Sequence, residues 1–206
     1  MTSNVFLDLD GTLLDVRNRL YDLFQELMPA STFTREEYWN LKRQKINQPD
    51  LLARYFNVTG DEAAAFKQAW LAQVEDPHRL ATDVPLPGVT QWLQQHAATH
   101  NLFLVTARQH PQRVEQQLSP LGWLPYFKQV IVTRQASSKA DLIRQSIPQP
   151  LPGVMVGDTG EDIRTAQSLG LTAIAVSSGF LGADVLAEYS PHHVFSTLTE
   201  IPDHVL

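Results

Sequence analysis

Short apolar runs alternate with amphipathic segments of helical length over residues 85–206. Uninterrupted apolar runs of this length are typical of strands that are buried on both faces of a sheet. Strands that alternate with amphipathic helices predict a mostly parallel sheet sandwiched by helices, a Rossmann-like α/β fold. The expected strands are NVFLDL near the start of the chain, then NLFLVT, QVIVT, GVMVG and LTAIAV, with HHVFS as a last edge strand.

The segments between these runs carry helix signals. Val89, Trp92, Leu93 and His96 share one face of the first expected helix. A serine N-cap opens the helix expected after QVIVT, and Gly170 closes the helix expected over GEDIRTAQSL.

Residues 17–78 have a different, wholly helical texture. The segment RLYDLFQELM spaces its apolar residues as one helix face. Thr34 with Glu37 three residues later forms a capping-box pattern at the start of a second helix. Tyr38 and Trp39 are expected in the core of this helical unit.

The two textures predict one core with an insertion. We expect an α/β core made of residues 1–15 and 85–206, and an all-helical cap over residues 16–84. The expected hinges are residues 14–16 at the entry to the cap and the proline-rich stretch 82–87 at its exit.

Composition excludes several classes of protein. The 206 residues are 43% hydrophobic, enough for a substantial core, and the absence of cysteine rules out a disulfide scaffold and favours a cytoplasmic setting. A net charge of −6 argues against a general nucleic-acid binder, and the most apolar late stretch is too interrupted to span a membrane. We therefore expect no nucleic-acid or membrane partner, and a monomer or homodimer.

Polar side chains stand where the expected strands end. Ligands of open parallel sheets bind outside the carboxyl ends of the strands, so these side chains are the candidate site. They comprise four carboxylates, one hydroxyl and one ammonium: Asp8, Asp10, Thr106, Lys139, Asp158 and Asp162.

The clustered carboxylates need a cation. Two unit charges about 4 Å apart near a protein surface repel by about 4 kcal/mol. A hard divalent cation with oxygen ligands removes that cost, and Mg²⁺ suits a site of few carboxylates. A metal, a lysine and a threonine hydroxyl together suit a phosphoryl group.

Four segments, DLDGTLLD, VTAR, SSKADLI and GDTGED, resemble in order the four motifs of the haloacid dehalogenase-like hydrolases. The resemblance covers essentially the whole α/β core. The helical insertion after the first motif is similar to the cap of the phosphoglycolate phosphatase-like branch of this family.

The resemblance implies a catalytic role for each aspartate. Asp8 would be the nucleophile that forms an aspartyl-phosphate, and Asp10 the acid and base that protonates the leaving oxygen and activates water. Asp8, the main-chain carbonyl of Asp10, and Asp158 would hold Mg²⁺. Dehalogenases of the family lack an aspartate at the position of Asp10, so phosphoryl transfer is favoured over dehalogenation.

The phosphoryl group would be bound by Thr106 and Lys139 on the same resemblance, and Asp162 would support the metal or position Lys139. The Gly11-Thr12 turn could supply backbone N–H groups to the phosphate. Bland alternatives exist, since Lys139 could be a solvated helix residue and Asp162 could only favour a helix N-terminus.

Arg108 has two equally weighted interpretations: it faces the substrate as a phosphate ligand, or it is a solvated surface residue. Lys42, Arg43 and Lys45 in the cap form a basic cluster that is best interpreted as a solvated helix face. The alternative is that one of them enters the site and contacts an anionic part of the substrate.

The function predicted from these patterns is a Mg²⁺-dependent phosphatase that hydrolyses a small phosphorylated metabolite. One alternative is a phosphomutase, an isomerase that uses the same residues. A second is a non-catalytic protein that binds a phosphorylated ligand, although such a protein has no need of Asp10. Phosphonate hydrolysis would require a cap lysine for a Schiff base, and no lysine stands out for that role.

Overall fold

The computed structural model describes residues 3–206 and contains a six-stranded sheet in the order β5-β4-β1-β6-β7-β8. Every neighbouring pair of strands in it is parallel, which confirms the predicted Rossmann-like α/β fold. HHVFS contributes the expected edge strand, and the histidines at its start are exposed. The strands are β1 (Asn4–Leu7), β4 (Asn101–Thr106), β5 (Phe127–Val132), β6 (Gly153–Gly157), β7 (Thr172–Val176) and β8 (His193–Phe195).

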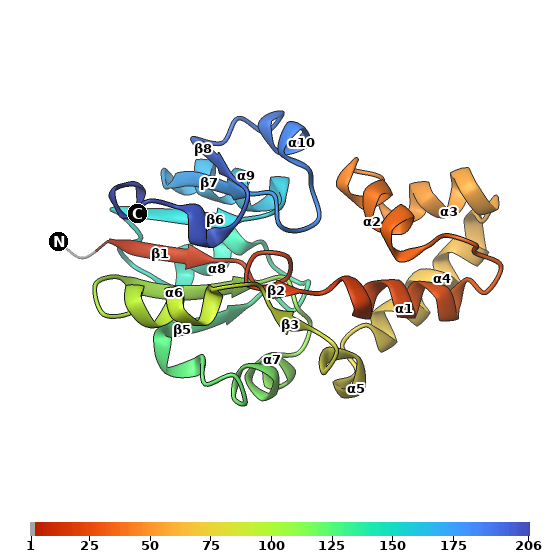
Figure 1. The fold of residues 1–206 in the computed structure, drawn as a ribbon, viewed down its shortest axis with the longest axis horizontal. Coiled ribbons are helices and arrows are strands. Elements are labelled where there is room, and N and C mark those ends of the chain that lie inside the picture. Colours follow the sequence, from red (N-terminus) through yellow and green to blue (C-terminus); the bar gives the residue numbers. More distant parts are fainter. Residues whose placement is uncertain (1–2) are drawn as a thin grey trace.

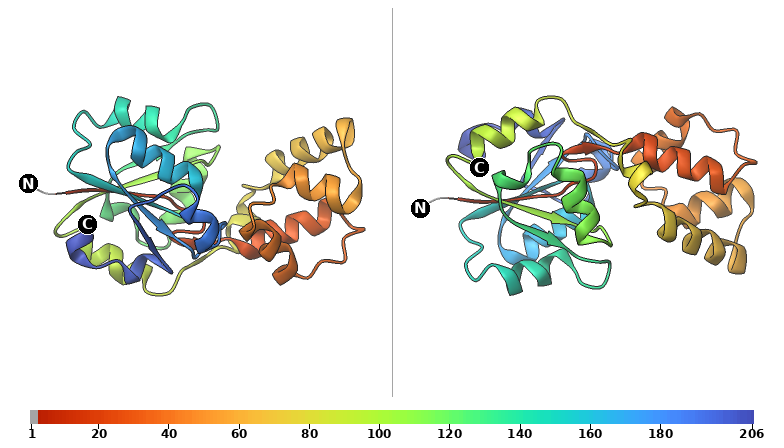
Figure 2. Two further views of the ribbon diagram at one scale, coloured as in Figure 1. Left: turned by 90° about the horizontal axis from the view of Figure 1, so that it is seen from above. Right: turned by 90° about the horizontal axis from the view of Figure 1, so that it is seen from below.

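Helices cover both faces of this sheet (Figure 2). Among residues 3–206, no helix is both long enough and apolar enough to cross a bilayer. The helices of the core are α6 (Val89–His96), α7 (Pro111–Leu118), α8 (Lys139–Ser146), α9 (Gly160–Leu169) and α10 (Ala183–Ala187), with short 3-10 turns at Leu124–Tyr126, Leu198–Glu200 and Asp203–Val205.

The alternation of side chains along β1 divides the core into two layers. Val5 and Leu7 pack into a cluster that includes α6 and α7. Phe6 points to the other face, into a cluster with α8 and α9, and its ring stacks on Phe103 with the ring centres 5.0 Å apart. Burial on both faces explains why β1 is apolar from Val5 to Leu7.

Most helix predictions for the core are confirmed. The four residues expected on one face of α6 are buried, and the side chain of Ser138 caps α8 by accepting a hydrogen bond from the Asp141 N–H. Gly170 ends α9 in the left-handed conformation, with φ 70°. Helix α10 was not predicted, because five residues are too few for a periodic pattern to be visible.

A two-stranded antiparallel ribbon joins the core to the inserted helices (Figure 1). It consists of β2 (Leu14–Asp15) and β3 (Val84–Pro85), where Leu14 pairs with Pro85. The ribbon was not predicted, since two-residue strands carry no pattern. The start of β1 and the C-terminus lie at the end of the core away from the inserted helices (Figure 1). The inserted helices are α1 (Arg17–Leu27), α2 (Arg35–Arg43), α3 (Gln48–Phe56), α4 (Gly60–Gln73) and α5 (Pro77–Leu80); they are called the cap below.

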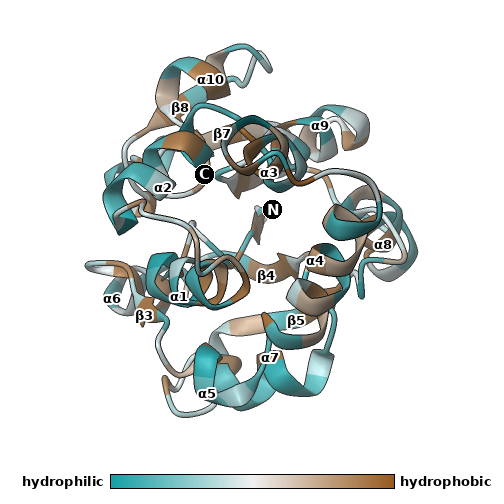
Figure 3. Ribbon diagram, turned by 90° about the vertical axis from the view of Figure 1, so that its right-hand side faces the viewer, coloured by the Kyte–Doolittle hydropathy of each residue, from teal (hydrophilic) through white to brown (hydrophobic). Residues whose placement is uncertain are grey.

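The cap has its own aromatic core. Phe24 of α1 stacks on Tyr38 of α2 with ring centres 4.6 Å apart, and its ring also lies 6.0 Å from Phe56 and 6.4 Å from Phe66. Tyr38 and Trp39 are buried as predicted, and the capping box between Thr34 and Glu37 is present. Viewed from the cap side, hydrophilic and hydrophobic residues alternate along these helices, as expected for amphipathic elements (Figure 3).

The cap contacts the core on two sides. On one side, the Arg43 Nη1 donates to the Ser177 carbonyl oxygen at 2.7 Å, and the Gly182 N–H donates to the Arg43 carbonyl at 3.1 Å. On the other side, the Glu75 carboxylate accepts the N–H groups of Gln109 and His110 at 2.6 and 3.2 Å. The cap is therefore held to the core on two sides of the space between them.

Replacing Phe24 by alanine should destabilise the protein by about 3–5 kcal/mol, because the change removes a fully buried ring at the centre of the cap core. Urea unfolding followed by circular dichroism measures this free energy. Tyr55→Ala is the control, since Tyr55 is 47% exposed and should cost less than about 1 kcal/mol. Equal losses for both variants would contradict the packing described above.

Candidate active site

The candidate site lies where the chain order of the sheet reverses. β1 lies between β4 and β6, so the crevice at their carboxyl ends is the topological switch point of the sheet. Asp8 follows β1 directly, Thr106 is the last residue of β4, and Asp158 follows β6. The fold therefore brings these side chains to one edge.

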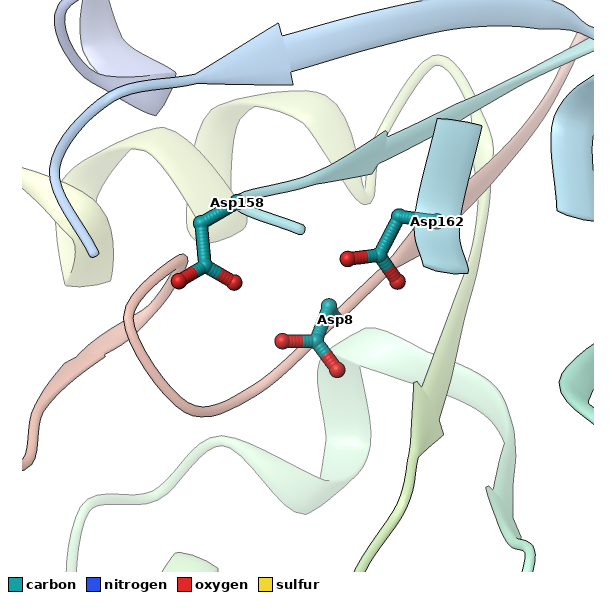
Figure 4. Close-up of side chains that lie close together, drawn as sticks. All are labelled: Asp8, Asp158 and Asp162. Atoms are coloured by element: carbon teal, nitrogen blue, oxygen red, sulfur yellow. The ribbon is translucent and has the colours of Figure 1, made fainter. Parts of the chain in front are cut away.

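Three aspartates converge at this edge (Figure 4). Asp8, Asp158 and Asp162 each place one carboxylate oxygen within 4.8 Å of the others. All three are buried, with exposed fractions of 5%, 0% and 1%. The close-up shows their carboxylates pointing toward one another from the ends of β1 and β6 and from α9 (Figure 4).

Lys139 lies among these carboxylates. Its Nζ donates to Asp8 Oδ1 at 2.5 Å and to Asp162 Oδ1 at 2.6 Å. Lys139 is only 2% exposed, so the alternative of a solvated helix residue is wrong. Burial lowers the pKa of Lys139, but Asp162 and Asp8 outweigh it and hold the pKa above its ordinary value, so the ammonium stays charged.

Asp162 combines two roles that the sequence left as alternatives. Its Oδ2 accepts from the Thr159 N–H at 3.1 Å and from the Thr159 hydroxyl at 2.6 Å, which completes a capping box at the start of α9. Its Oδ1 faces Lys139. Gly157 makes room for this carboxylate, because a Cβ at Gly157 would lie 2.2 Å from Asp162 Cγ. One side chain thus caps a helix and positions the lysine.

Asp158 is held by backbone and glycine contacts. Its Oδ2 accepts the Phe180 N–H at 2.6 Å, and its Oδ1 accepts from the Thr12 hydroxyl at 3.5 Å. A Cβ on Gly179 would lie 1.9 Å from Asp158 Oδ2, and one on Gly11 would lie 2.3 Å from it. Both positions therefore have to be glycine for the carboxylate to lie where it does.

The Gly11-Thr12 turn was expected to supply backbone N–H groups to the phosphate, and for the N–H of Gly11 this expectation needs correction. The Gly11 N–H donates to the Leu14 carbonyl at 2.8 Å, so it is not free to bind a phosphate. Neither Gly11 nor Thr12 is part of the cavity wall described below. What the turn does in this structure is support Asp158.

The buried carboxylates carry more negative charge than Lys139 neutralises. Burial raises the pKa of Asp8 to about 7, although Lys139 partly opposes the shift. Burial, together with Asp8 and Asp162, raises the pKa of Asp158 well above its ordinary value. The shifts mean that the ionised cluster is unfavourable as it stands, and that a bound cation would stabilise it.

The donor set fits Mg²⁺. All ligand atoms are carboxylate oxygens, the hard donors that this ion prefers, and they number few enough to leave positions for water and substrate. Asp8 and Asp158 belong to the metal ligands expected from the sequence. Asp162 joins them in the cluster, whereas the Asp10 carbonyl stays a prediction.

Asp10 lies apart from this cluster and is paired with two arginines. It accepts from Arg108 Nε at 2.6 Å and Arg108 Nη2 at 2.5 Å, and Arg19 Nη2 lies 3.2 Å from it. Burial raises the pKa of Asp10, but Arg108 and Arg19 outweigh burial and lower it to about 2. Asp10 is therefore ionised in this structure.

Arg108 is not a solvated surface residue, since it is only 4% exposed. Besides Asp10 it contacts Asp83 at 3.3 Å, and within residues 3–206 its Nη1 is buried without a hydrogen-bond partner. It lines the cavity, so its role as a phosphate ligand stays a prediction.

Sequence reasoning missed Arg19 and Asp83. Arg19 Nε pairs with Asp83 at 2.9 Å, which links α1 to the residue directly before β3. Arg19 stands four residues before Leu23, on the apolar side of its helix. A charge on an apolar helix face is the signal that could have identified it, because such a charge is buried only when paired.

A cavity of about 580 Å³ lies between the cap and the core at this point. Thr106, which is almost fully buried, is part of its wall. The core side of its wall includes Asp8, Asp10, Thr106, Arg108 and Lys139, and the cap side includes Arg19, Tyr38, Lys42, Gln48 and Trp70.

A parallel α/β core with a carboxylate cluster at its switch point and a cap above it defines a class of capped hydrolases. The comparison with family models agrees, since residues 5–176 match the haloacid dehalogenase-like hydrolase model. The match covers most of the chain, which therefore belongs to this family and is a hydrolase of the haloacid dehalogenase type. The resemblance found in the sequence is confirmed.

Solved structures share the fold over nearly the whole chain. A haloacid dehalogenase-like family hydrolase from Streptococcus pneumoniae has a TM-score of 0.76 at 18% identity, with 94% of this chain and 93% of that one covered. A predicted phosphoglycolate phosphatase from Haemophilus somnus has a TM-score of 0.73 at 19% identity, with 95% and 94% covered. A HAD-type hydrolase from Bacillus subtilis, solved with bound magnesium, has a TM-score of 0.64 at 16% identity, with 97% and 96% covered. The comparison with curated proteins gave no match.

The stability of the metal-free protein should fall as the pH rises from about 5 to about 7.5. The folded state holds protons on Asp8 and Asp158 over this range, whereas the unfolded state has already lost them, so folding is favoured at the lower pH. We expect the melting temperature in EDTA to drop by about 3 °C or more. Mg²⁺ or the substitution Asp8→Asn should flatten the dependence; an unchanged slope in Asp8→Asn would contradict the assignment to this cluster.

Gly179→Ala should weaken Mg²⁺ binding roughly 10-fold or more, because the new Cβ displaces the Asp158 carboxylate. Isothermal titration with MgCl₂ measures the affinity. Gly182→Ala in the same loop is the matched control, since its nearest neighbour would lie 3.5 Å away, in ordinary contact. Equal affinities in the two variants would rule out the close approach as a requirement.

Proposed function

We propose that this hydrolase is a Mg²⁺-dependent phosphatase that acts on small phosphate monoesters through an aspartyl-phosphate on Asp8. The observation that carries the proposal is the convergence of Asp8, Asp158, Asp162 and Lys139 beside the cavity between cap and core. A carboxylate that must attack a phosphate needs this kind of positive surroundings, since its own charge otherwise repels the target.

Asp8 is the proposed nucleophile. Its Oδ1 is held by Lys139, while its Oδ2 accepts no hydrogen bond within residues 3–206 and is the oxygen available for attack. Attack forms a bond between this oxygen and phosphorus as the bond from phosphorus to the leaving alcohol breaks. Water then releases inorganic phosphate and restores the carboxylate.

Asp10 is the proposed proton carrier. It stands two residues after Asp8 and lines the same cavity, so it can reach the oxygen that leaves. It donates a proton to that oxygen and later accepts one from the attacking water. Because Arg108 and Arg19 hold Asp10 ionised, the proton donor forms only when these contacts loosen on substrate binding.

Three side chains of this chain would neutralise and orient the phosphoryl group. Lys139 and Arg108 supply positive charge, and the Thr106 hydroxyl would donate a hydrogen bond. When bound, Mg²⁺ would screen the carboxylates from the phosphate oxygens and polarise the phosphorus centre. Asp8 and Asp158 would hold the ion, with Asp162 beside them.

Closure of the cap over a bound substrate would exclude bulk water during the first step. The contacts of Arg43 and Glu75 bring the cap to the core on both sides of a cavity that is still partly open, and the ribbon of β2 and β3 is the natural pivot for the movement. Small metabolites fit such a cavity, whereas a folded protein or a nucleic-acid duplex does not.

The test is phosphate release from p-nitrophenyl phosphate and from a panel of sugar, glycolate and nucleotide monophosphates, with Mg²⁺ and with EDTA. We expect turnover only with the metal. Asp8→Asn should lose about 10³-fold or more in kcat, and Asp10→Asn about 10²- to 10⁴-fold. Asp184→Asn, at an exposed position of α10, is the matched control and should keep full activity.

Each contrary outcome has a meaning. Sugar phosphates that change position without releasing phosphate would replace the phosphatase by a mutase. A folded protein that binds Mg²⁺ but neither releases nor transfers phosphate from any compound would overturn the catalytic proposal in favour of a binding protein.

A further inference from the structure

The cations of the cap differ in how they are paired. Three of them form ion pairs with carboxylates: Arg19 with Asp83, Arg79 with Glu26, and Lys45 with Glu188. Arg43 instead binds carbonyl oxygens of the core. Lys42 is different. It lines the cavity, is half-buried, and has no carboxylate within salt-bridge distance among residues 3–206.

Lys42 is held in place by polar and aromatic neighbours. Its Nζ donates to Gln48 Oε1 at 2.5 Å and lies 5.4 Å from the centre of the Tyr38 ring. This leaves donor capacity on the ammonium, which has three protons. Burial lowers the pKa of Lys42 to about 8, a shift that no neighbouring carboxylate offsets. The group is still mostly protonated at pH 7.

Gln48 supplies a second donor at the same place. Its Oε1 accepts from both Lys42 and the Tyr38 hydroxyl, the latter at 3.2 Å, so this oxygen is fully used. Its Nε2 is buried and has no hydrogen-bond partner within residues 3–206. A buried amide N–H without a partner is unfavourable, which indicates a position that a ligand fills.

The carboxylates of the cavity do not serve Lys42. Asp8 and Asp10 are paired with Lys139 and with the arginines. Glu75 accepts backbone N–H groups of the core, and Glu161 is exposed. The charge of Lys42 is therefore left for a ligand that reaches the cap end of the cavity.

The last turn of α2 offers a competing explanation for a lysine at this position, since cations there interact favourably with the helix dipole. That effect needs only an exposed side chain. It does not account for a lysine turned into the cavity, or for the unpaired amide of Gln48 beside it.

We propose that Lys42 and Gln48 form a second anion site, so that the substrate is a small phosphate monoester with a second anionic group such as a carboxylate. The phosphate would lie at Asp8, Thr106 and Lys139, and the second group would accept hydrogen bonds from Lys42 Nζ and Gln48 Nε2. The inference rests on the proposed function, because it takes the other end of the cavity as the phosphate end.

The experiment compares substrates that differ only in this group. The pairs are phosphoglycolate with 2-hydroxyethyl phosphate, and 3-phosphoglycerate with glycerol 3-phosphate. The quantity measured is the ratio of kcat/KM for the anionic member to that for the neutral member. Lys42→Gln should lower this ratio roughly 10- to 100-fold, mostly through KM of the anionic ester.

Further variants separate charge from structure. Lys42→Arg should restore part of the ratio. Gln48→Glu should lower it, because the new carboxylate pairs with Lys42 and repels the ligand. Lys67→Gln removes a charge from an exposed position of α4 outside the cavity wall and should leave both the ratio and the activity unchanged.

Failure of this inference can be told from failure of the proposed function. If the wild type releases phosphate from p-nitrophenyl phosphate but the ratio is the same in Lys42→Gln, the second anion site is wrong and the phosphatase stands. If the wild type releases no phosphate from any ester, the phosphatase fails. Calorimetric titration with 3-phosphonopropionate and 3-hydroxypropylphosphonate then decides the site: tighter binding of the carboxylate that is lost in Lys42→Gln supports it, and equal binding of the two overturns it.

Discussion

The structure of this site depends on one problem of charge: three carboxylates are buried together with a single ammonium. Lys139 neutralises part of that charge by contacting Asp8 and Asp162 at once. The remainder is tolerated because the surrounding backbone is built for it, with a helix start at Asp162 and the Phe180 N–H at Asp158. Such an arrangement lowers the stability of the metal-free protein, and a bound cation would restore it.

Much of the fold, and the part of the site at the carboxyl ends of the strands, could be predicted from the sequence because both depend on short-range patterns. Apolar runs and helical periodicity identify the parallel sheet, and the carboxyl ends of parallel strands share an edge by construction. The residue after each strand, such as Asp8 or Asp158, is therefore placed without knowledge of any loop. The N-cap placed Lys139 at the start of α8, but only the family resemblance favoured a role for it in the site.

The rest could not be predicted because it depends on contacts between residues that are far apart in the chain. Arg19 and Asp83 are 64 positions apart, and Arg108 and Asp10 are 98 positions apart, so no local pattern pairs them. The position of Lys42 likewise follows from its contacts with Gln48 and Tyr38, not from its basic neighbours. A helix face in solvent and a helix face that lines a cavity can have the same composition, so the sequence alone does not distinguish them.

The contact of Arg43 with the loop 177–182 joins two parts of the molecule that the chain keeps far apart. The guanidinium binds the carbonyl oxygens of Ser177 and Gly179, and the same loop supplies the Phe180 N–H to Asp158. The cap therefore contacts the same stretch of backbone that positions the Asp158 carboxylate. The Gly179 carbonyl oxygen and the Phe180 N–H belong to the same peptide unit, so a displacement of α2 would act through a single peptide on the hydrogen bond that holds Asp158.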